Sequence, residues 1–290
     1  MSLHYLKNNK LNISVNSFGA ELCSVKKDNG TECLWQAQKD IWPRHAPVLF
    51  PIVGKLNNDR FTYEGTQYAL SQHGFARDME FIPVEESETV LEFELVPNEV
   101  SFSKYPFHFS LRIKYELKDE TLKVIYTVFN PNNSSLPFSI GAHPGFNCKT
   151  KEGETLNDHQ IEFSNKKPLL AQKLKDGLVS DETYLIETSN GILDLNVELF
   201  SNDALVFKNT QVEDLTLVSK KTGNKIRLEC KGWPYFGIWS KKGCNDFVCL
   251  EPWYGIADGL GFKEDISKKE GIINLAAHQT FKAEFSMTIL

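Results

Sequence analysis

The chain has 290 residues, of which 41% are hydrophobic and 24% are charged, and its formal net charge is −6. This composition is too apolar for a disordered protein, and an acidic chain without a long basic run is a poor nucleic-acid binder. No apolar stretch is long enough to cross a membrane, and residues 1–9 lack the apolar core of a signal peptide. We therefore expect a cytoplasmic protein with neither a nucleic-acid nor a membrane partner.

Apolar and polar residues alternate through much of the chain. The pattern is clearest in residues 91–95, 111–117 and 281–289, where every second residue is apolar. Such alternation is typical of antiparallel strands with one face in a core and one in water. Turn-forming residues at 118–120 and 222–224 separate strand-like runs, and the second of these turns predicts a hairpin.

Helical signals are weak in comparison. We find no amphipathic helix longer than about two turns, and neither G-x-G-x-x-G nor G-x-x-x-x-G-K-[ST] occurs. This excludes a parallel sheet built from βαβ units and phosphate-binding loops. Strand-like segments run from Leu11 to Ile289 without a linker or repeat. We predict an all-β fold, a large antiparallel β-sandwich that forms one domain over residues 1–290.

The six cysteines are scattered, and no two form a C-x-x-C pair. Four lie in apolar stretches, which favours buried free thiols over disulfides or a zinc site. No cluster of histidines or carboxylates has metal-ligand spacing, so we predict no metal.

Three parts of the chain break the alternation and concentrate Gly, Pro and single ionisable residues. They are residues 45–56 with 72–78, residues 141–147, and residues 233–239 with 249–255. Gly and Pro fix a non-repetitive backbone, and loops on a rigid scaffold commonly carry sites. Two histidines, a glutamate and several tryptophans in these segments are typical of a sugar site. Aromatic rings match the apolar faces of a pyranose, and His and Glu exchange protons with its hydroxyls.

Each of these signals also has a structural interpretation. A histidine in a Gly/Pro turn is commonly structural, and Glu-Pro opens many turns. Trp233, Trp239 and Trp253 are, taken singly, more typical of a core than of a sugar platform. Only the combination points to a site.

The remaining histidines carry weaker signals. His45 precedes the first segment and could line the same cleft, and His108 lies in an expected strand. The histidines expected at the surface, because their neighbours in sequence are polar, are His4, His159 and His278.

Four motifs, taken together in this order, resemble the aldose 1-epimerase (galactose mutarotase) superfamily and, within it, the LacX-like bacterial branch. They are residues 46–56 (APVLFPIVGKL), 72–81 (QHGFARDMEF), 141–147 (GAHPGFN) and 249–255 (CLEPWYG). The resemblance implies a galactose mutarotase-like supersandwich whose open cleft binds hexoses without a cofactor. It also implies an isomerase that interconverts α and β anomers.

The resemblance assigns a role to individual residues. His143 would be the general acid that protonates the ring oxygen O5, and Glu251 the general base that takes the proton of the anomeric hydroxyl. C1–O5 cleavage then gives the open-chain aldehyde, which rotates about C1–C2 before the ring recloses. His73 would position the sugar near its ring oxygen, Asp203 would hold its hydroxyls, and Trp253 is expected to contact it.

One position departs from the pattern of the family. Mutarotases of this superfamily carry an Arg where this chain has Lys55, which offers a point charge in place of a planar fork. Arg77, in an HGFAR motif similar to that of hexose-6-phosphate epimerase relatives, is the residue expected to compensate. Alternatively, both cations are solvated or paired with carboxylates such as Asp78 or Glu80. The net negative charge of the chain favours a neutral hexose over a phosphorylated one.

The sequence therefore favours an aldose 1-epimerase, and two alternatives stay open: a hexose-6-phosphate 1-epimerase, or a non-catalytic carbohydrate-binding protein on the same fold. A β-sandwich glycosidase would need two carboxylates about 5–10 Å apart. Glu251 and Asp203 could formally serve, but His143 would then have no role. The sequence does not indicate the oligomeric state.

Overall fold

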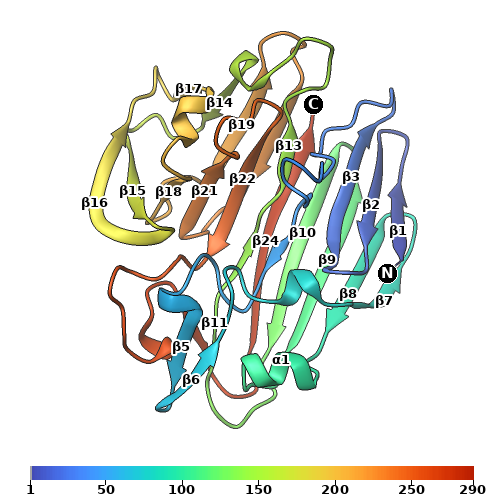
Figure 1. The fold of residues 1–290 in the computed structure, drawn as a ribbon. Coiled ribbons are helices and arrows are strands. Elements are labelled where there is room, and N and C mark those ends of the chain that lie inside the picture. Colours follow the sequence, from blue (N-terminus) through green and yellow to red (C-terminus); the bar gives the residue numbers. More distant parts are fainter. Residues whose placement is uncertain (1) are drawn as a thin grey trace.

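Antiparallel strands dominate the computed structural model, which describes residues 2–290 (Figure 1). Within these residues the α-helical content is the single short helix α1 (Glu99–Lys104), which a capping box between Asn98 and Ser101 starts. No helix in the described part of the chain has the length and apolar character needed to cross a bilayer. The predicted all-β class is confirmed.

The larger sheet has nine strands. In chain order they are β7 (Ile82–Glu86), β8 (Val90–Leu95), β9 (Ser110–Lys118), β10 (Thr121–Phe129), β14 (His159–Phe163), β17 (Ile192–Asp194), β19 (Asp214–Ser219), β20 (Lys225–Glu229) and β24 (Thr280–Ile289). Their order across the sheet is β17-β14-β19-β20-β24-β10-β9-β8-β7.

The second sheet has eight strands and carries the cavity described below. Its members are β4 (Val48–Leu49), β12 (Ile140–Ala142), β13 (Gly145–Asn147), β15 (Leu169–Lys175), β16 (Leu178–Ile186), β18 (Leu205–Phe207), β21 (Tyr235–Trp239) and β22 (Phe247–Tyr254). The order is β16-β15-β18-β21-β22-β12-β4, and β13 also pairs with β22.

Seven further strands form small sheets at the periphery (Figure 1). They are β1 (Leu3–Lys7), β2 (Leu11–Asn16) and β3 (Glu21–Lys27) in one sheet, the hairpin of β5 (Arg60–Tyr63) and β6 (Thr66–Ala69), and the pair of β11 (Leu136–Phe138) and β23 (Ile273–Leu275). The three-stranded sheet is tied to the turn before β8, where the Lys7 N–H donates to the Glu88 carbonyl.

Burial in the strands follows the alternation of apolar and polar residues in the sequence. In β9, Leu111, Ile113, Tyr115 and Leu117 are buried while the residues between them are more exposed. These side chains join Val248 and Leu250 of the eight-stranded sheet in one large apolar cluster, so the core lies between the two sheets. The sandwich of two extensive sheets is thus confirmed.

The predicted turns are also confirmed. Residues 118–120 connect β9 to β10, and residues 222–224 connect β19 to β20, each a directly paired antiparallel hairpin. The cysteine prediction holds for the described residues, in which all six thiols are free and five are buried.

Two histidine predictions are wrong. His108 lies in the loop before β9 and not in a strand. His159, expected at the surface, is only 3% exposed. It begins β14 on the face that also buries Ile161 and Phe163, and its Nδ1 donates to the Thr155 carbonyl at 2.9 Å. The period-two pattern therefore outweighs the polarity of its neighbours in sequence.

Candidate active site

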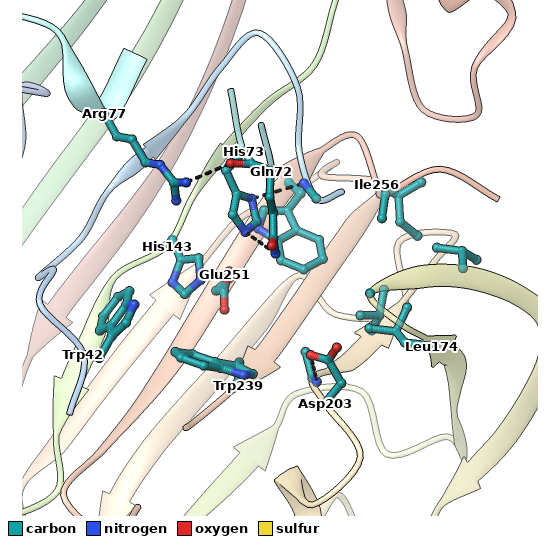
Figure 2. Close-up of a pocket in the computed structure, with 17 residues that line it drawn as sticks. Trp42, Gln72, His73, Arg77, His143, Leu174, Asp203, Trp239, Glu251 and Ile256 are labelled. Atoms are coloured by element: carbon teal, nitrogen blue, oxygen red, sulfur yellow. Dashed lines mark hydrogen bonds and ion pairs between the residues drawn. The ribbon is translucent and has the colours of Figure 1, made fainter. Parts of the chain in front are cut away.

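A cavity of about 340 Å³ lies on the face of the eight-stranded sheet that points away from the main core (Figure 2). Alternate residues of β22 face opposite ways: Val248 and Leu250 enter the main core, whereas Glu251 and Trp253 face the cavity. The lining residues are Trp42, Gly54, Gln72, His73, Arg77, His143, Leu174, Gly177, Val179, Asp203, Ala204, Val206, Trp239, Glu251, Trp253, Ile256 and Ala257.

Two glycines on neighbouring strands make room for Trp253. Its cross-strand partner is Gly141, and Gly237 is the partner of Glu251. A Cβ atom on Gly141 would lie 2.6 Å from Trp253 Cδ1, and one on Gly237 would lie 2.4 Å from Trp253 Cη2. The indole therefore lies across both positions, where only glycine fits.

His143 follows β12 and is held between aromatic rings. Its imidazole stacks on Trp42 with ring centroids 5.0 Å apart, and it meets Trp239 and His73 edge-on at 5.6 Å each. Its Nε2 lies 3.2 Å from Glu251 Oε2. The structure thus brings together the two residues expected to exchange protons with a ligand.

Burial changes the protonation of both partners. It lowers the pKa of His143 to about 3, and the nearby charges of Arg77 and Arg44 act in the same direction. Burial also raises the pKa of Glu251 well above its usual range. Burial disfavours each charged form, so it favours a neutral imidazole beside a protonated carboxyl. His143 and Glu251 then share one titratable proton, in addition to the N–H of the neutral imidazole.

His73 is oriented by the backbone of the first motif. The Gly54 N–H donates to His73 Nδ1 at 3.1 Å, and burial lowers the pKa of His73 well below its usual value. A neutral imidazole that accepts at Nδ1 carries its proton on Nε2. Nε2 lies 3.2 Å from the side-chain amide nitrogen of Gln72. His73 is therefore a hydrogen-bond donor at the cavity wall.

Buried polar atoms without partners gather around this cavity. In residues 2–290 six buried side-chain polar atoms lack a hydrogen-bond partner, and four of them belong to cavity residues: Arg77 Nε, His143 Nδ1, Glu251 Oε2 and Trp253 Nε1. Because buried polar groups in folded proteins are nearly always satisfied, such a concentration at one cavity indicates a polar ligand.

Of the three other charged residues that the sequence predicts for the site, two line the cavity and one does not. Arg77 lines the cavity, and its Nη2 donates to the Gln72 carbonyl at 2.8 Å. Asp203 lines the opposite side in an exposed loop (Figure 2), with its backbone at φ 109°. Lys55 is absent from the lining, and its Nζ donates to the Asp176 carbonyl in the β15–β16 turn at 3.2 Å. A sugar contact of Lys55 stays a prediction, because its side chain lies at the edge of the cavity, against the lining residue Gly177.

The tryptophans separate into two groups. Trp233 is fully buried and its indole N–H donates to the Glu284 carbonyl, whereas Trp239 and Trp253 line the cavity. Trp42 was not singled out by the sequence reasoning, although its Trp-Pro step directly precedes the first motif. His45 is absent from the lining.

One group at the site has the composition of a metal centre. Ligand atoms of His143, Cys249 and Glu251 lie within 4.8 Å of one another. Burial raises the pKa of the Cys249 thiol well above its usual range, as it does for the Glu251 carboxyl. A divalent ion would have to displace the protons of both buried groups, which weakens its binding.

Comparisons with known proteins agree with this fold. The family model described as aldose 1-epimerase matches residues 2–261. The plasmid and chromosomal LacX proteins of Lactococcus lactis subsp. lactis are each 33% identical over 295 residues, covering 98% of both chains.

Two solved structures are also similar over almost their whole length. A galactose mutarotase related enzyme from Lactobacillus acidophilus has 35% identity and a TM-score of 0.95, with 100% of this chain and 97% of that chain covered. A galactose mutarotase-like protein from Lactobacillus casei has 29% identity and a TM-score of 0.94, with both chains fully covered.

The packing of Trp253 gives a testable prediction. Gly237→Ala would force its Cβ against the indole, and we expect a loss of about 1–3 kcal/mol of unfolding free energy with a changed tryptophan emission spectrum. Gly259→Ala is the matched control, because no atom lies within 4 Å of its Cβ position, and it should change stability by less than about 0.5 kcal/mol. Urea unfolding measures both. Equal stabilities would contradict the close packing.

Proposed function

The chain belongs to the aldose 1-epimerase family, and we propose that it interconverts the α and β anomers of a hexose by acid–base ring opening and reclosure. The observation that carries this proposal is the set of unpartnered buried polar atoms around His143 and Glu251. We further propose that residues 1–290 form a single domain of this kind. The cytoplasmic location expected from the sequence stays a prediction.

The cavity suits a pyranose in both size and surface. Its volume of about 340 Å³ lies at the lower end of the range of small-molecule sites. Trp42, Trp239 and Trp253 offer apolar faces to the C–H faces of a sugar ring. The unpartnered N–H groups and the carboxyl oxygen match ring hydroxyls, which both donate and accept hydrogen bonds.

The proposed ring opening moves two protons in opposite directions. Glu251, as carboxylate, takes the proton of the anomeric hydroxyl, and His143, as imidazolium, gives its proton to O5 while the C1–O5 bond breaks. The pair then consists of a neutral imidazole and a protonated carboxyl, with an open-chain aldehyde between them. No proton enters or leaves the site in this step.

Ring closure reverses these transfers. After rotation about C1–C2, neutral His143 takes the proton of the O5 hydroxyl, which attacks the other face of the carbonyl, and Glu251 protonates the carbonyl oxygen. The neutral pair favoured by burial is thus the form that the open-chain intermediate meets. Hydrogen bonds from the bound sugar must make the charged form accessible, since burial disfavours it.

The remaining predicted residues have binding roles in this proposal. His73 would donate from Nε2 to an oxygen near C1 or O5, because its ring meets that of His143 at 5.6 Å. Asp203 would accept from hydroxyls on the far side of the sugar, and Trp253 would pack against its ring. A glycosidase is less favoured, since the contact between His143 and Glu251 forms an acid–base pair without the second carboxylate.

A hexose 6-phosphate is the second candidate substrate, and Arg77 is the observation that favours it. Its guanidinium lines the cavity, its Nε makes no hydrogen bond, and the charge of the nearby Arg44 lowers the pKa of His143. Against this, Asp78 is 2.7 Å from Arg44 and 3.7 Å from Arg77, so its carboxylate already offsets part of the charge. We favour the neutral hexose.

The acid–base roles predict the effect of removing either group. His143→Asn and Glu251→Gln should each lower kcat for anomer exchange by about 10²–10⁴-fold, because each variant loses one proton transfer. His73→Asn should act more on KM than on kcat. NMR exchange spectroscopy on a panel of aldohexoses measures these rates, with His159→Asn as a buried histidine outside the cavity for comparison.

Near-normal turnover by folded Glu251→Gln would exclude Glu251 as the base. Tight sugar binding without exchange in the wild-type protein would favour the carbohydrate-binding alternative.

The shifted pKa values predict the pH dependence. The active form carries one proton on the pair, so kcat/KM should stay level through neutral pH, above the pKa of His143 at about 3 and below the raised pKa of Glu251. It should fall at alkaline pH, when Glu251 loses its proton and the pair has none to give. Polarimetry with subtraction of the buffer rate tests this profile. A rate that rises steadily as the pH increases from 5 to 8 would show instead that the pair must lose a proton to act.

The choice between substrates is tested through Arg77. We expect kcat/KM for free glucose or galactose to equal or exceed that for the 6-phosphates at low and moderate salt. A phosphate preference above tenfold that fades with salt and is lost in Arg77→Ala would establish the phosphorylated substrate instead. Arg112→Ala, which removes a surface arginine paired with Glu94, is the control for nonspecific charge effects.

A further inference from the structure

A second hollow, with a volume of about 530 Å³, lies between the β5–β6 hairpin and the segment that follows β22. A backbone bridge between Thr62 and Asp265 joins its two sides (Figure 1). In the described part of the chain, no residue lines both this hollow and the cavity of the candidate active site. Ile256 and Ala257 line the cavity, whereas the next residue, Asp258, lines the hollow. The hollow is therefore a separate space behind the cavity wall.

A buried ion pair with an open gap lines this hollow: Asp258 and Lys269, whose side chains are 3% and 1% exposed. Asp258 Oδ2 accepts from the backbone and side-chain N–H groups of Asn57 at 2.8 and 3.2 Å, whereas Oδ1 makes no hydrogen bond. Lys269 Nζ donates to the carbonyls of Ile256 and Glu270. It lies 3.7 Å from Asp258 Oδ1, which is too far for a hydrogen bond. One N–H of the ammonium and one oxygen of the carboxylate are thus left for a third group.

We propose that this hollow is a second ligand site that binds a polyol phosphate, with one hydroxyl between Asp258 and Lys269 and the phosphate at Arg60 and Lys263. The proposal goes beyond the proposed function, because such a ligand needs no anomeric carbon and does not enter the cavity where the ring is opened.

A hydroxyl is the group that fits the gap between the two charged ends. It accepts a hydrogen bond from the ammonium of Lys269 and donates one to the carboxylate of Asp258 at the same time. An ammonium group has no acceptor for the first of these bonds, and a carboxylate has no donor for the second. Because buried polar groups in folded proteins are nearly always satisfied, the unpartnered Asp258 Oδ1 indicates a ligand that supplies this hydroxyl.

The exposed part of the hollow carries positive charge. Arg60 and Lys263 both line it, and among residues 2–290 neither finds a partner for its side chain in an ion pair or a hydrogen bond. Glu264 lines the same part, but its carboxylate is already paired with Lys268 at 3.1 Å. Two free cations on the rim of one hollow suit a phosphate, which accepts charge-assisted hydrogen bonds and matches the fork of a guanidinium.

The remaining walls suit the carbon chain of a polyol. Phe61, Phe262 and Ile266 provide apolar surface, and Thr62 and Gln67 provide polar groups for further hydroxyls. The volume lies within the range of small-molecule sites. The hollow thus offers each part of a polyol phosphate a matching surface.

Calorimetric titration with sorbitol 6-phosphate tests this site, since the compound carries both groups and has no anomeric carbon. We expect it to bind at least about tenfold more tightly than sorbitol, inorganic phosphate or n-butyl phosphate, each of which lacks a required group. Arg60→Ala and Lys263→Ala should each weaken its binding about fivefold. Lys242→Ala, which removes an exposed lysine between β21 and β22, is the control and should leave the affinity unchanged.

Asp258→Asn tests the position of the hydroxyl. It removes the charge of the carboxylate, so it should lower the affinity for sorbitol 6-phosphate more than that for n-butyl phosphate. If this variant does not fold, the comparison of the two ligands on the unaltered protein decides the same point. Equal affinities there would overturn the proposal, because the gap then takes no hydroxyl from a ligand.

Two further results would also overturn the second site. One is the absence of binding by sorbitol 6-phosphate. The other is binding that Arg77→Ala weakens and Arg60→Ala leaves intact, which would place the ligand in the catalytic cavity. Anomer exchange of free hexoses is measured on the same preparations. Its absence would refute the proposed function and leave the result on sorbitol 6-phosphate unaffected.

Discussion

The burial of Glu251 is the constraint on which the site depends. A carboxyl that is 1% exposed cannot ionise at its usual pKa, and the imidazole beside it cannot readily take a proton either. Burial therefore favours one shared titratable proton on the pair, and hydrogen bonds to a ligand would influence which partner carries it. A pair exposed to water would ionise independently, with Glu251 charged and His143 exchanging its proton with solvent.

The strand arrangement is what allows such a polar pair to be buried. β22 is covered on both faces, with Val248 and Leu250 in the main core and Glu251 and Trp253 on the outer side. Its neighbours contribute Gly141 and Gly237 at the positions beside Trp253 and Glu251, so the indole lies across both glycines. Most of the unpartnered buried polar atoms, which cost free energy on folding, therefore lie at the cavity, where a ligand can form hydrogen bonds with them.

Sequence reasoning reaches the strands and the acid–base residues for different reasons. Alternation with a period of two is a local signal, so the core strands can be read directly, and even the buried position of His159 was present in the pattern of β14. His143 and Glu251 stand out because Gly and Pro interrupt the alternation around them. Local patterns do not show which loops meet in space: nothing near Lys55 indicates the Asp176 carbonyl, 121 residues later, and nothing near Trp42 indicates the stacking on His143.

The sheet and the loops contribute different residues to the site. Glu251 and Trp253 come from a central strand and His143 from the step between two short strands, so the proton-transferring pair is fixed by the hydrogen-bonded frame of the sheet. Arg77, Asp203 and the turn that holds Lys55 come from connecting segments at its margin.

The opposite wall of the cavity contains Ile256 and Ala257. Lys269 supports this wall, because it is buried against Asp258 and donates to the Ile256 carbonyl. Because the margin is anchored separately from β22, its residues can change without moving His143 and Glu251. In the proposed function, the preference for a free or a phosphorylated hexose then depends on the margin, whereas anomer exchange depends on the sheet.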